Sequence, residues 1–258
     1  MIALGSGIAV GPAIGDTTGI SGGAIGVLGG WGLDRFITPF ISKRQTVRLF
    51  QWGTQAAENI SQRLENGEKF RDDGFFSETP TNCSKMDEVV ESTLKKVMDT
   101  TEEPKIKFMA NLTENVHFDS DLDLDTYRRI LKYLEELSYR QLCITKLFMN
   151  VAQIDLNSCG NPNITQNLSS ILTDCLEVCD KGLINSNNPL MEKIHELYLG
   201  VPSGPIFVDR HADPEYPGFA NSEGFSDVLS ENLFKFAKLD QIPNEDVDSI
   251  LRELKSDS

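Results

Sequence analysis

Positive charge is scarce in this chain of 258 residues, where 24 Lys and Arg stand against 39 Asp and Glu. The formal net charge is −15, which argues against a general nucleic-acid binder, because such a protein needs a basic face to displace counterions from phosphate. The same balance argues against a protein that coats anionic lipid by charge alone. We therefore expect no nucleic-acid partner.

Histidine and cysteine are too few and too scattered to form an obvious metal site. The five cysteines, an odd number in a long chain, favour a reducing compartment over a disulfide framework. His211, with Asp209 and Asp213, lies in the one stretch that looks catalytic, but no second His or Cys is near it. A phosphate-binding glycine loop and a nucleophile elbow are both missing. We expect no enzyme activity, no metal and no cofactor; an enzyme that uses residues 209–213 is the weakest alternative.

An unbroken run of about 20 apolar residues, the length that spans a bilayer as a helix, is missing from the N-terminal region. Residues 2–41 are nevertheless apolar and carry only three formal charges: Asp16, Asp34 and Arg35. Pro12 and Asp16 interrupt the first part, so a helical hairpin of roughly 2–15 and 19–40 fits as well as one span. The segment has no basic n-region and no cleavage site, so we do not expect a signal peptide.

Glycine is plentiful in this segment and recurs every four residues. The two registers are Gly7, Gly11, Gly15, Gly19 and Gly23, and then Gly22, Gly26 and Gly30. A step of four returns to nearly the same face of an α-helix, so each register forms a groove without side chains. Each interior glycine costs about 1 kcal/mol relative to alanine, so a bilayer or a tightly packed neighbour must compensate. We predict close packing at Gly7, Gly11, Gly15, Gly19, Gly23, Gly26 and Gly30.

Cations follow the apolar segment directly, at Lys43, Arg44 and Arg48, as expected on the cytoplasmic side of a membrane. Trp31 and Trp52 are candidates for the level of the lipid headgroups. Three interpretations of the segment stay open: a membrane-inserting or pore-forming glycine zipper, a glycine-rich hairpin buried in a soluble oligomer, and a flexible leader. The sustained period of four favours the first two, because a flexible linker has no reason to keep register.

From Ser42 the composition becomes that of a helical protein that folds in water. Apolar periodicity, caps and turn residues predict nine helices, over 46–65, 85–98, 105–116, 126–137, 138–151, 165–181, 190–199, 226–239 and 243–254. Asp123 or Asp125 is expected to cap the helix from 126, and Ser138 with Gln141 has the form of a capping box. We expect Gly67 and Gly182 to end helices.

Two helices and a third helix, followed by residues 180–184 and a hairpin-like stretch, have the order of elements of a winged helix-turn-helix; separately, residues 205–208 are the best strand candidate. The supposed recognition helix carries Asp174, Glu177 and Asp180 but one cation, Lys181. This surface would repel phosphate, so we expect a protein-contact role for the winged-helix-like portion.

The middle of the chain resembles bacterial helical proteins near the abortive-infection alpha family. The resemblance is carried by residues 102–112 (Glu-Glu-Pro-Lys-Ile-Lys-Phe-Met-Ala-Asn-Leu), 137–142 (Leu-Ser-Tyr-Arg-Gln-Leu), 182–184 (Gly-Leu-Ile) and the closing segment 229–254. It implies a bacterial host and a place in antiphage defence. It supplies no catalytic residues, and it does not extend to the glycine zipper.

We expect an all-α protein with a glycine-zipper module at 1–42, a helical region at 43–118 and a winged-helix-like domain with C-terminal helices at 119–258. The favoured function is a bacterial defence effector that oligomerises with itself and breaches the lipid bilayer. It would lie in the cytoplasm and move to, or reside at, the inner membrane. The alternative is a soluble homo-oligomeric scaffold or adaptor that binds a partner protein of a defence system.

Overall fold

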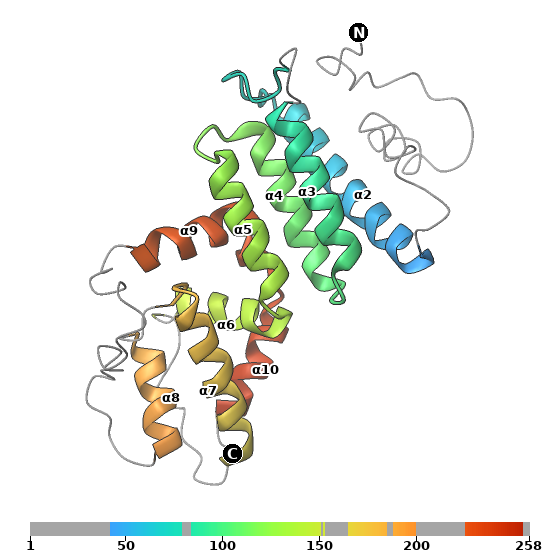
Figure 1. Ribbon diagram of the computed structural model, residues 1–258. Coiled ribbons are helices and arrows are strands. Elements are labelled where there is room, and N and C mark those ends of the chain that lie inside the picture. Colours follow the sequence, from blue (N-terminus) through green and yellow to red (C-terminus); the bar gives the residue numbers. More distant parts are fainter. Residues whose placement is uncertain are drawn as a thin grey trace, which may run out of the picture. The chain divides into compact units, whose positions relative to one another are not determined.

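The computed structural model describes residues 42–78, 84–150, 152, 165–184, 188–199 and 225–254 (Figure 1). Within these ranges every regular element is helical, which confirms the predicted all-α class for this part of the chain. The elements are α2 (Lys43–Glu65), α3 (Lys85–Asp99), α4 (Pro104–Phe118), α5 (Leu124–Glu136), α6 (Tyr139–Met149), α7 (Thr165–Asp180), α8 (Pro189–Leu199), α9 (Phe225–Ala237), the short η5 (Leu239–Gln241) and α10 (Asn244–Leu254). The glycine registers, Trp31, the strand candidate at 205–208 and the polar stretch at 209–213 lie outside the described residues.

Serine caps determine where three of the helices begin. Ser42, Ser84 and Ser138 each accept a hydrogen bond from the backbone N–H three residues on, and the side chain at that position bonds back to the serine N–H. The reciprocal pair satisfies two of the N–H groups that a helix start leaves without partners. The capping box predicted at Ser138 is confirmed. The box at Ser42 starts α2 three residues before the predicted 46.

Local polar and glycine signals set other helix ends as predicted. The Asp123 carboxylate accepts the Thr126 N–H at 2.7 Å and caps α5. Gly67 and Gly182 follow the ends of α2 and α7 with φ of +85° and +72°, a left-handed conformation that glycine adopts without a steric penalty. The N–H after each glycine returns to a carbonyl in the last helical turn, from Glu68 to Arg63 and from Leu183 to Val178.

The chain divides into two compact units. Unit 1 contains α2 to α5 together with residues 236–238, and unit 2 contains α6 to α8, α9 up to residue 235, η5 and α10. Along the sequence the two units divide between residues 136 and 137, and α5 belongs to unit 1 because it packs on α3 and α4. Residues 236–238 are therefore a short segment that joins unit 1 from far along the sequence.

Unit 1 is built around α4, which contacts α2, α3 and α5 (Figure 1). Every residue of α4 from Phe108 to His117 is buried. Trp52 of α2 and Tyr127 of α5 are fully buried in the same core. The prediction that Trp52 lies at the headgroup level is therefore wrong: its ring fills the core, and its N–H donates to Thr113 at 3.3 Å.

In unit 2, α7 contacts α6, α8 and α10. Its core is aliphatic, with Leu142, Ile144, Ile194 and Ile250 buried to within 2% of full burial. Cys175 lies in this core at 0% exposure. In the described part of the chain, no helix is both long enough and apolar enough to span a bilayer.

Candidate functional site

The first half of α2 presents an exposed face made by Lys43, Arg44, Val47 and Phe50, which we call the α2 outer face. Val47 and Phe50 are 45% and 44% exposed, and both cations are exposed as well. With 100° of rotation per residue, these four positions fall within about 120° of one another around the helix. Two large apolar side chains and two cations thus share one surface of unit 1.

Negative charge is missing from this part of the helix. Lys43 to Ala57 contains no Asp or Glu, although the chain has 39 of them, and the first acidic residue of α2 is Glu58. Neither Lys43 nor Arg44 forms an ion pair with any residue that the structure describes. The positive end of the helix dipole lies at the same turn. The α2 outer face is therefore a local cationic surface on an acidic protein.

Arg48, the third predicted flanking cation, has a different role from Lys43 and Arg44. Its guanidinium donates to the Met98 carbonyl at the end of α3, at 3.1 Å. A carbonyl in the last turn of a helix has no partner within that helix, so this bond satisfies it. Arg48 therefore fixes α2 against α3, and Lys43 and Arg44 are the two cations of the α2 outer face.

Val47 and Phe50 lie outside the buried stripe of α2, which is formed by Leu49, Trp52, Ala56 and Ile60. Their spacings of three, four and four residues are those of a helix face, and they could have identified the true stripe. Two overlapping apolar patterns are present in this helix, and only packing against α4 selects between them.

A second candidate site is a set of buried polar groups where residues 236–238 meet α2 and α4. We call it the polar clasp; it consists of Arg63, Asn111, Glu114 and Asn115 with the segment 236–238. The Asn111 and Asn115 amides donate to the carbonyls of Ala237 (3.1 Å) and Phe236 (2.8 Å). These carbonyls end α9 and have no partners further along that helix. The clasp therefore caps α9 from a different element.

The charge at the centre of the polar clasp is the Glu114 carboxylate, whose side chain is 1% exposed. Arg63 lies 3.2 Å from it, and the Lys238 ammonium lies 2.7 Å from it. A buried carboxylate is tolerated only when it is paired with a cation and hydrogen-bonded. Arg63 and Lys238 provide both, because each is a cation that donates a hydrogen bond to Glu114. The backbone of Lys238 is in the left-handed conformation, with φ of +55°.

Beside the clasp, α4 carries a chain of buried hydroxyl and imidazole groups. Thr113 donates to the Met109 carbonyl (2.9 Å) and bonds Tyr127, whose hydroxyl also bonds Thr93. Burial raises the pKa of Tyr127 to about 12. The His117 Nδ1–H donates to the Thr113 carbonyl at 2.7 Å, and burial lowers the pKa of this imidazole to about 4. The ring is therefore neutral at pH 7.

Unit 2 has its own ionic group, centred on Arg140 of α6. Its guanidinium binds Glu253 of α10 with two bonds, at 2.8 and 2.9 Å, and Asp174 of α7 at 2.9 Å. Asp174 is thus engaged inside unit 2. Glu177, which accepts a hydrogen bond from the Gln141 amide at 2.5 Å, and Asp180 are exposed on α7.

Lys146 of α6 is a buried cation of another kind. Its ammonium donates to the carbonyls of Asp240 (3.0 Å) and Ile242 (2.7 Å) and to the Asn244 side chain (3.1 Å). All three acceptors are uncharged, and together they hold the turn between η5 and α10. Lys146 therefore stabilises a turn and offers no free amine.

Cys143 and Cys175 are buried thiols whose surroundings disfavour the thiolate. Burial raises the pKa of Cys143 to about 11, and it raises the pKa of Cys175 further. A nucleophilic or metal-binding cysteine needs a thiolate, which these positions disfavour. Within the ranges that the structure describes, no three His, Cys, Asp or Glu side chains gather to hold a metal ion.

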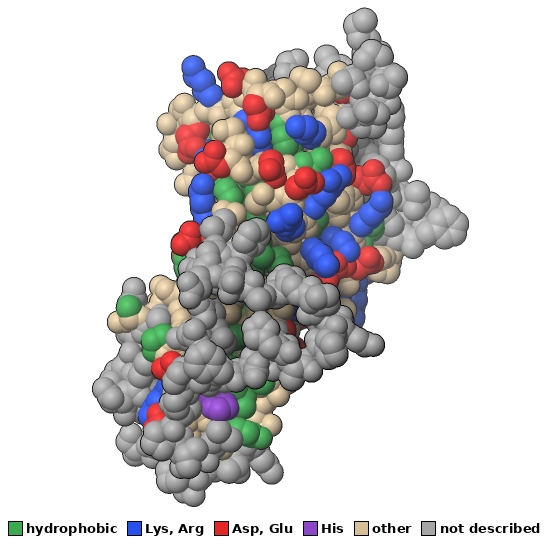
Figure 2. Space-filling view, turned by 60° about the vertical axis from the view of Figure 1, so that its left-hand side comes forward, with side chains coloured by type: hydrophobic (Ala, Val, Ile, Leu, Met, Phe, Trp, Pro, Cys, Tyr) green, Lys and Arg blue, Asp and Glu red, His purple; other side chains and the backbone are tan. Residues whose placement is uncertain are grey.

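The visible surface also gives little sign of a ligand site. Basic and acidic side chains are interspersed on the face drawn in Figure 2, a pattern typical of paired surface charges such as Lys96 with Glu135.

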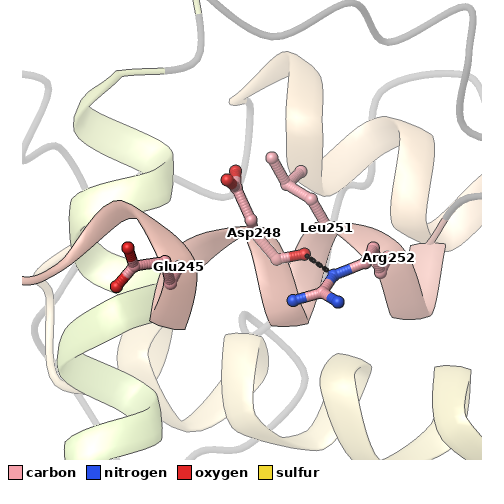
Figure 3. Close-up of a pocket in the computed structure, with 4 residues that line it drawn as sticks. All are labelled: Glu245, Asp248, Leu251 and Arg252. Atoms are coloured by element: carbon pink, nitrogen blue, oxygen red, sulfur yellow. Dashed lines mark hydrogen bonds between the residues drawn. The ribbon is translucent and has the colours of Figure 1, made fainter.

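A hollow of about 370 Å³ lies along α10, lined by Glu245, Asp248, Leu251 and Arg252 (Figure 3). The four lining residues come from one helix, and Arg252 donates to the Asp248 carbonyl at 3.3 Å. Polar groups from other described elements do not converge on it, as they would at a specific binding site.

The comparisons with known proteins add no relative. No protein-family model matches the chain, and no match is found among curated proteins or solved structures.

Proposed function

We propose that the chain is a membrane-acting, oligomerising effector, in which the glycine-rich segment at 2–41 inserts into a bilayer and the helical units form its body. The observation that carries the proposal is the glycine period of four, which ends shortly before the cationic start of α2. Bacterial antiphage defence is proposed as the setting, on the resemblance to abortive-infection alpha proteins.

The glycine registers support packing between copies of the segment. A run of interior glycines destabilises an isolated helix by about 1 kcal/mol for each residue. The loss is offset where two backbones approach closely, as small-residue repeats allow in membranes. Two or more copies in lipid would provide that approach at Gly7, Gly11, Gly15, Gly19, Gly23, Gly26 and Gly30.

The helical body supports a regulatory role within this proposal. Its unit 1 begins at Ser42, directly after the apolar segment, and the cap there gives α2 a defined start. The body would hold the segment in check and release it on a trigger. We keep the winged-helix-like arrangement of 119–258 as part of the proposal, with the acidic outer face of α7 as a protein-contact surface.

The test is dye release from lipid vesicles by the full chain. We expect release by the wild type and none by Gly15→Leu or Gly19→Leu, with unchanged circular dichroism. Leucine is more apolar than glycine, so insertion driven by hydrophobicity alone would be kept or improved. Gly29→Leu adds the same side chain outside both registers and serves as the matched control.

Two results would contradict the proposal. Release that survives in both zipper variants would show that close packing is not needed. A stable oligomer that forms without lipid and releases no dye would favour the soluble scaffold instead.

A further inference from the structure

The α2 outer face has no occupant among the described residues, and its chemistry identifies one. We propose that Lys43, Arg44, Val47 and Phe50 rest on the surface of an anionic phospholipid bilayer. The inference rests on the proposed function, because a segment inserted up to Ile41 would hold the next helical turn at the bilayer surface. It adds to that function the class of lipid and a contact surface on α2, which lies outside the glycine registers.

The geometry suits a helix that lies in the bilayer interface. Val47 and Phe50 are three residues apart and on one side of α2, so they enter the same plane. Lys43 and Phe50 are about 10 Å apart along the axis, at 1.5 Å per residue. A helix in the interface places its apolar side chains among the acyl chains and its cations beside the phosphates.

The charge pattern selects anionic lipid despite the net charge of −15. Glu58, the nearest acidic residue within α2, is 15 positions from Lys43 and therefore about 22 Å along the helix. This distance exceeds twice the Debye length of about 10 Å at 0.1 M salt, so salt screens most of the attraction between Lys43 and Glu58. Local cations near a negative leaflet are attracted even when the whole protein is acidic.

Three cations on α3 and α5 are paired with carboxylates: Lys95 with Glu91, Lys96 with Glu135, and Arg128 with Glu88. These pairs neutralise the surface of α3 and α5, which therefore offers a bilayer little net charge. The α2 outer face combines exposed apolar side chains with two cations that form no ion pair with a described residue, and apolar area and positive charge both strengthen binding to a lipid surface.

The experiment measures the partition coefficient of the full chain on vesicles of phosphatidylcholine alone or of phosphatidylcholine and phosphatidylglycerol at 3:1. We expect the wild type to prefer the anionic vesicles and to lose that preference in 1 M salt. Lys43→Gln with Arg44→Gln should lower binding to the anionic vesicles about 30-fold. Val47→Ser with Phe50→Ser should lower binding to both vesicle types about tenfold. The matched controls, Lys95→Gln with Lys132→Gln and Leu176→Ser with Tyr198→Ser, should bind as the wild type does.

The outcomes separate this inference from the proposed function. If both α2 double variants bind and release dye as the wild type does, while Gly15→Leu releases none, the α2 contact is wrong and the glycine mechanism stands. If the wild type releases no dye but its anionic binding depends on the four α2 residues, the contact stands and the proposed function fails. If Val47→Ser with Phe50→Ser changes the oligomeric state in the absence of lipid, the face contacts protein and the inference is overturned.

Discussion

Glu114 in unit 1 and Lys146 in unit 2 are two buried charges that are stabilised in different ways. Unit 1 buries an anion, Glu114, and neutralises it with two cations, one of which comes from 124 positions away. Unit 2 buries a cation, Lys146, and surrounds it with three uncharged oxygens from one turn. The clasp thus depends on an ion pair between distant segments, whereas the turn depends on hydrogen bonds alone. The difference teaches that residues 236–238 belong to unit 1 for an electrostatic reason, and not merely by apolar packing.

The largest effect should follow from removing the buried anion. Glu114→Gln keeps the shape of the side chain but leaves Arg63 and Lys238 without their shared charge. We expect a loss of about 3–5 kcal/mol in the free energy of unfolding, the range for breaking a buried pair. Glu68→Gln, which removes an exposed partner of the same Arg63, should cost below about 1 kcal/mol. Urea denaturation measures both, and equal losses would refute the central place of Glu114.

The pH dependence of unit 1 should come next in size. The pKa of His117 is about 4 in the folded chain against an ordinary 6.5, so the unfolded state binds more protons between these values. Stability should be full above pH 6.5, fall as the pH drops to 4, and stay level below, a change of about 3 kcal/mol from this group. His117→Phe should flatten that part of the profile of unfolding free energy against pH. An unchanged slope in the variant would assign the effect to other groups.

Unit 2 should respond more mildly to loss of its buried charge. Lys146→Met keeps the aliphatic stem and removes the ammonium, which leaves three oxygens without their donor. We expect a loss of about 1–3 kcal/mol, smaller than for Glu114→Gln because no opposite charge is left behind. A loss larger than that of Glu114→Gln, measured in the same urea series, would reverse the contrast between the units.

The smallest expected effect distinguishes strain from charge at Lys238. Lys238→Ala and Lys238→Gly both remove the ion pair with Glu114, but glycine also relieves the left-handed backbone. We expect Lys238→Gly to be more stable than Lys238→Ala by about 1 kcal/mol. Thermal unfolding of the two variants side by side measures the difference, and equal stability would mean that the backbone is unstrained there.

The helices could be predicted from the sequence because their signals are local. Ser138, Asp123 and Gly182 act within one turn, and each has the effect that its position predicts. The polar clasp could not be predicted, because Asn111 and Lys238 are brought together only by tertiary packing. The α2 outer face was missed for a related reason: Val47 and Leu49 both suit an apolar stripe, and contact with α4 decides which one is buried.

The resemblance to abortive-infection alpha proteins, the glycine zipper and the lipid partner all remain predictions. The structure contributes a folded body that begins directly after residue 41 and a surface on α2 suited to anionic lipid. Vesicle leakage by the full chain beside its Gly15→Leu and Gly29→Leu variants tests the account most directly. Release by the wild type and Gly29→Leu, with none by Gly15→Leu, is the predicted result; equal release by all three, or no release by the wild type, would contradict it.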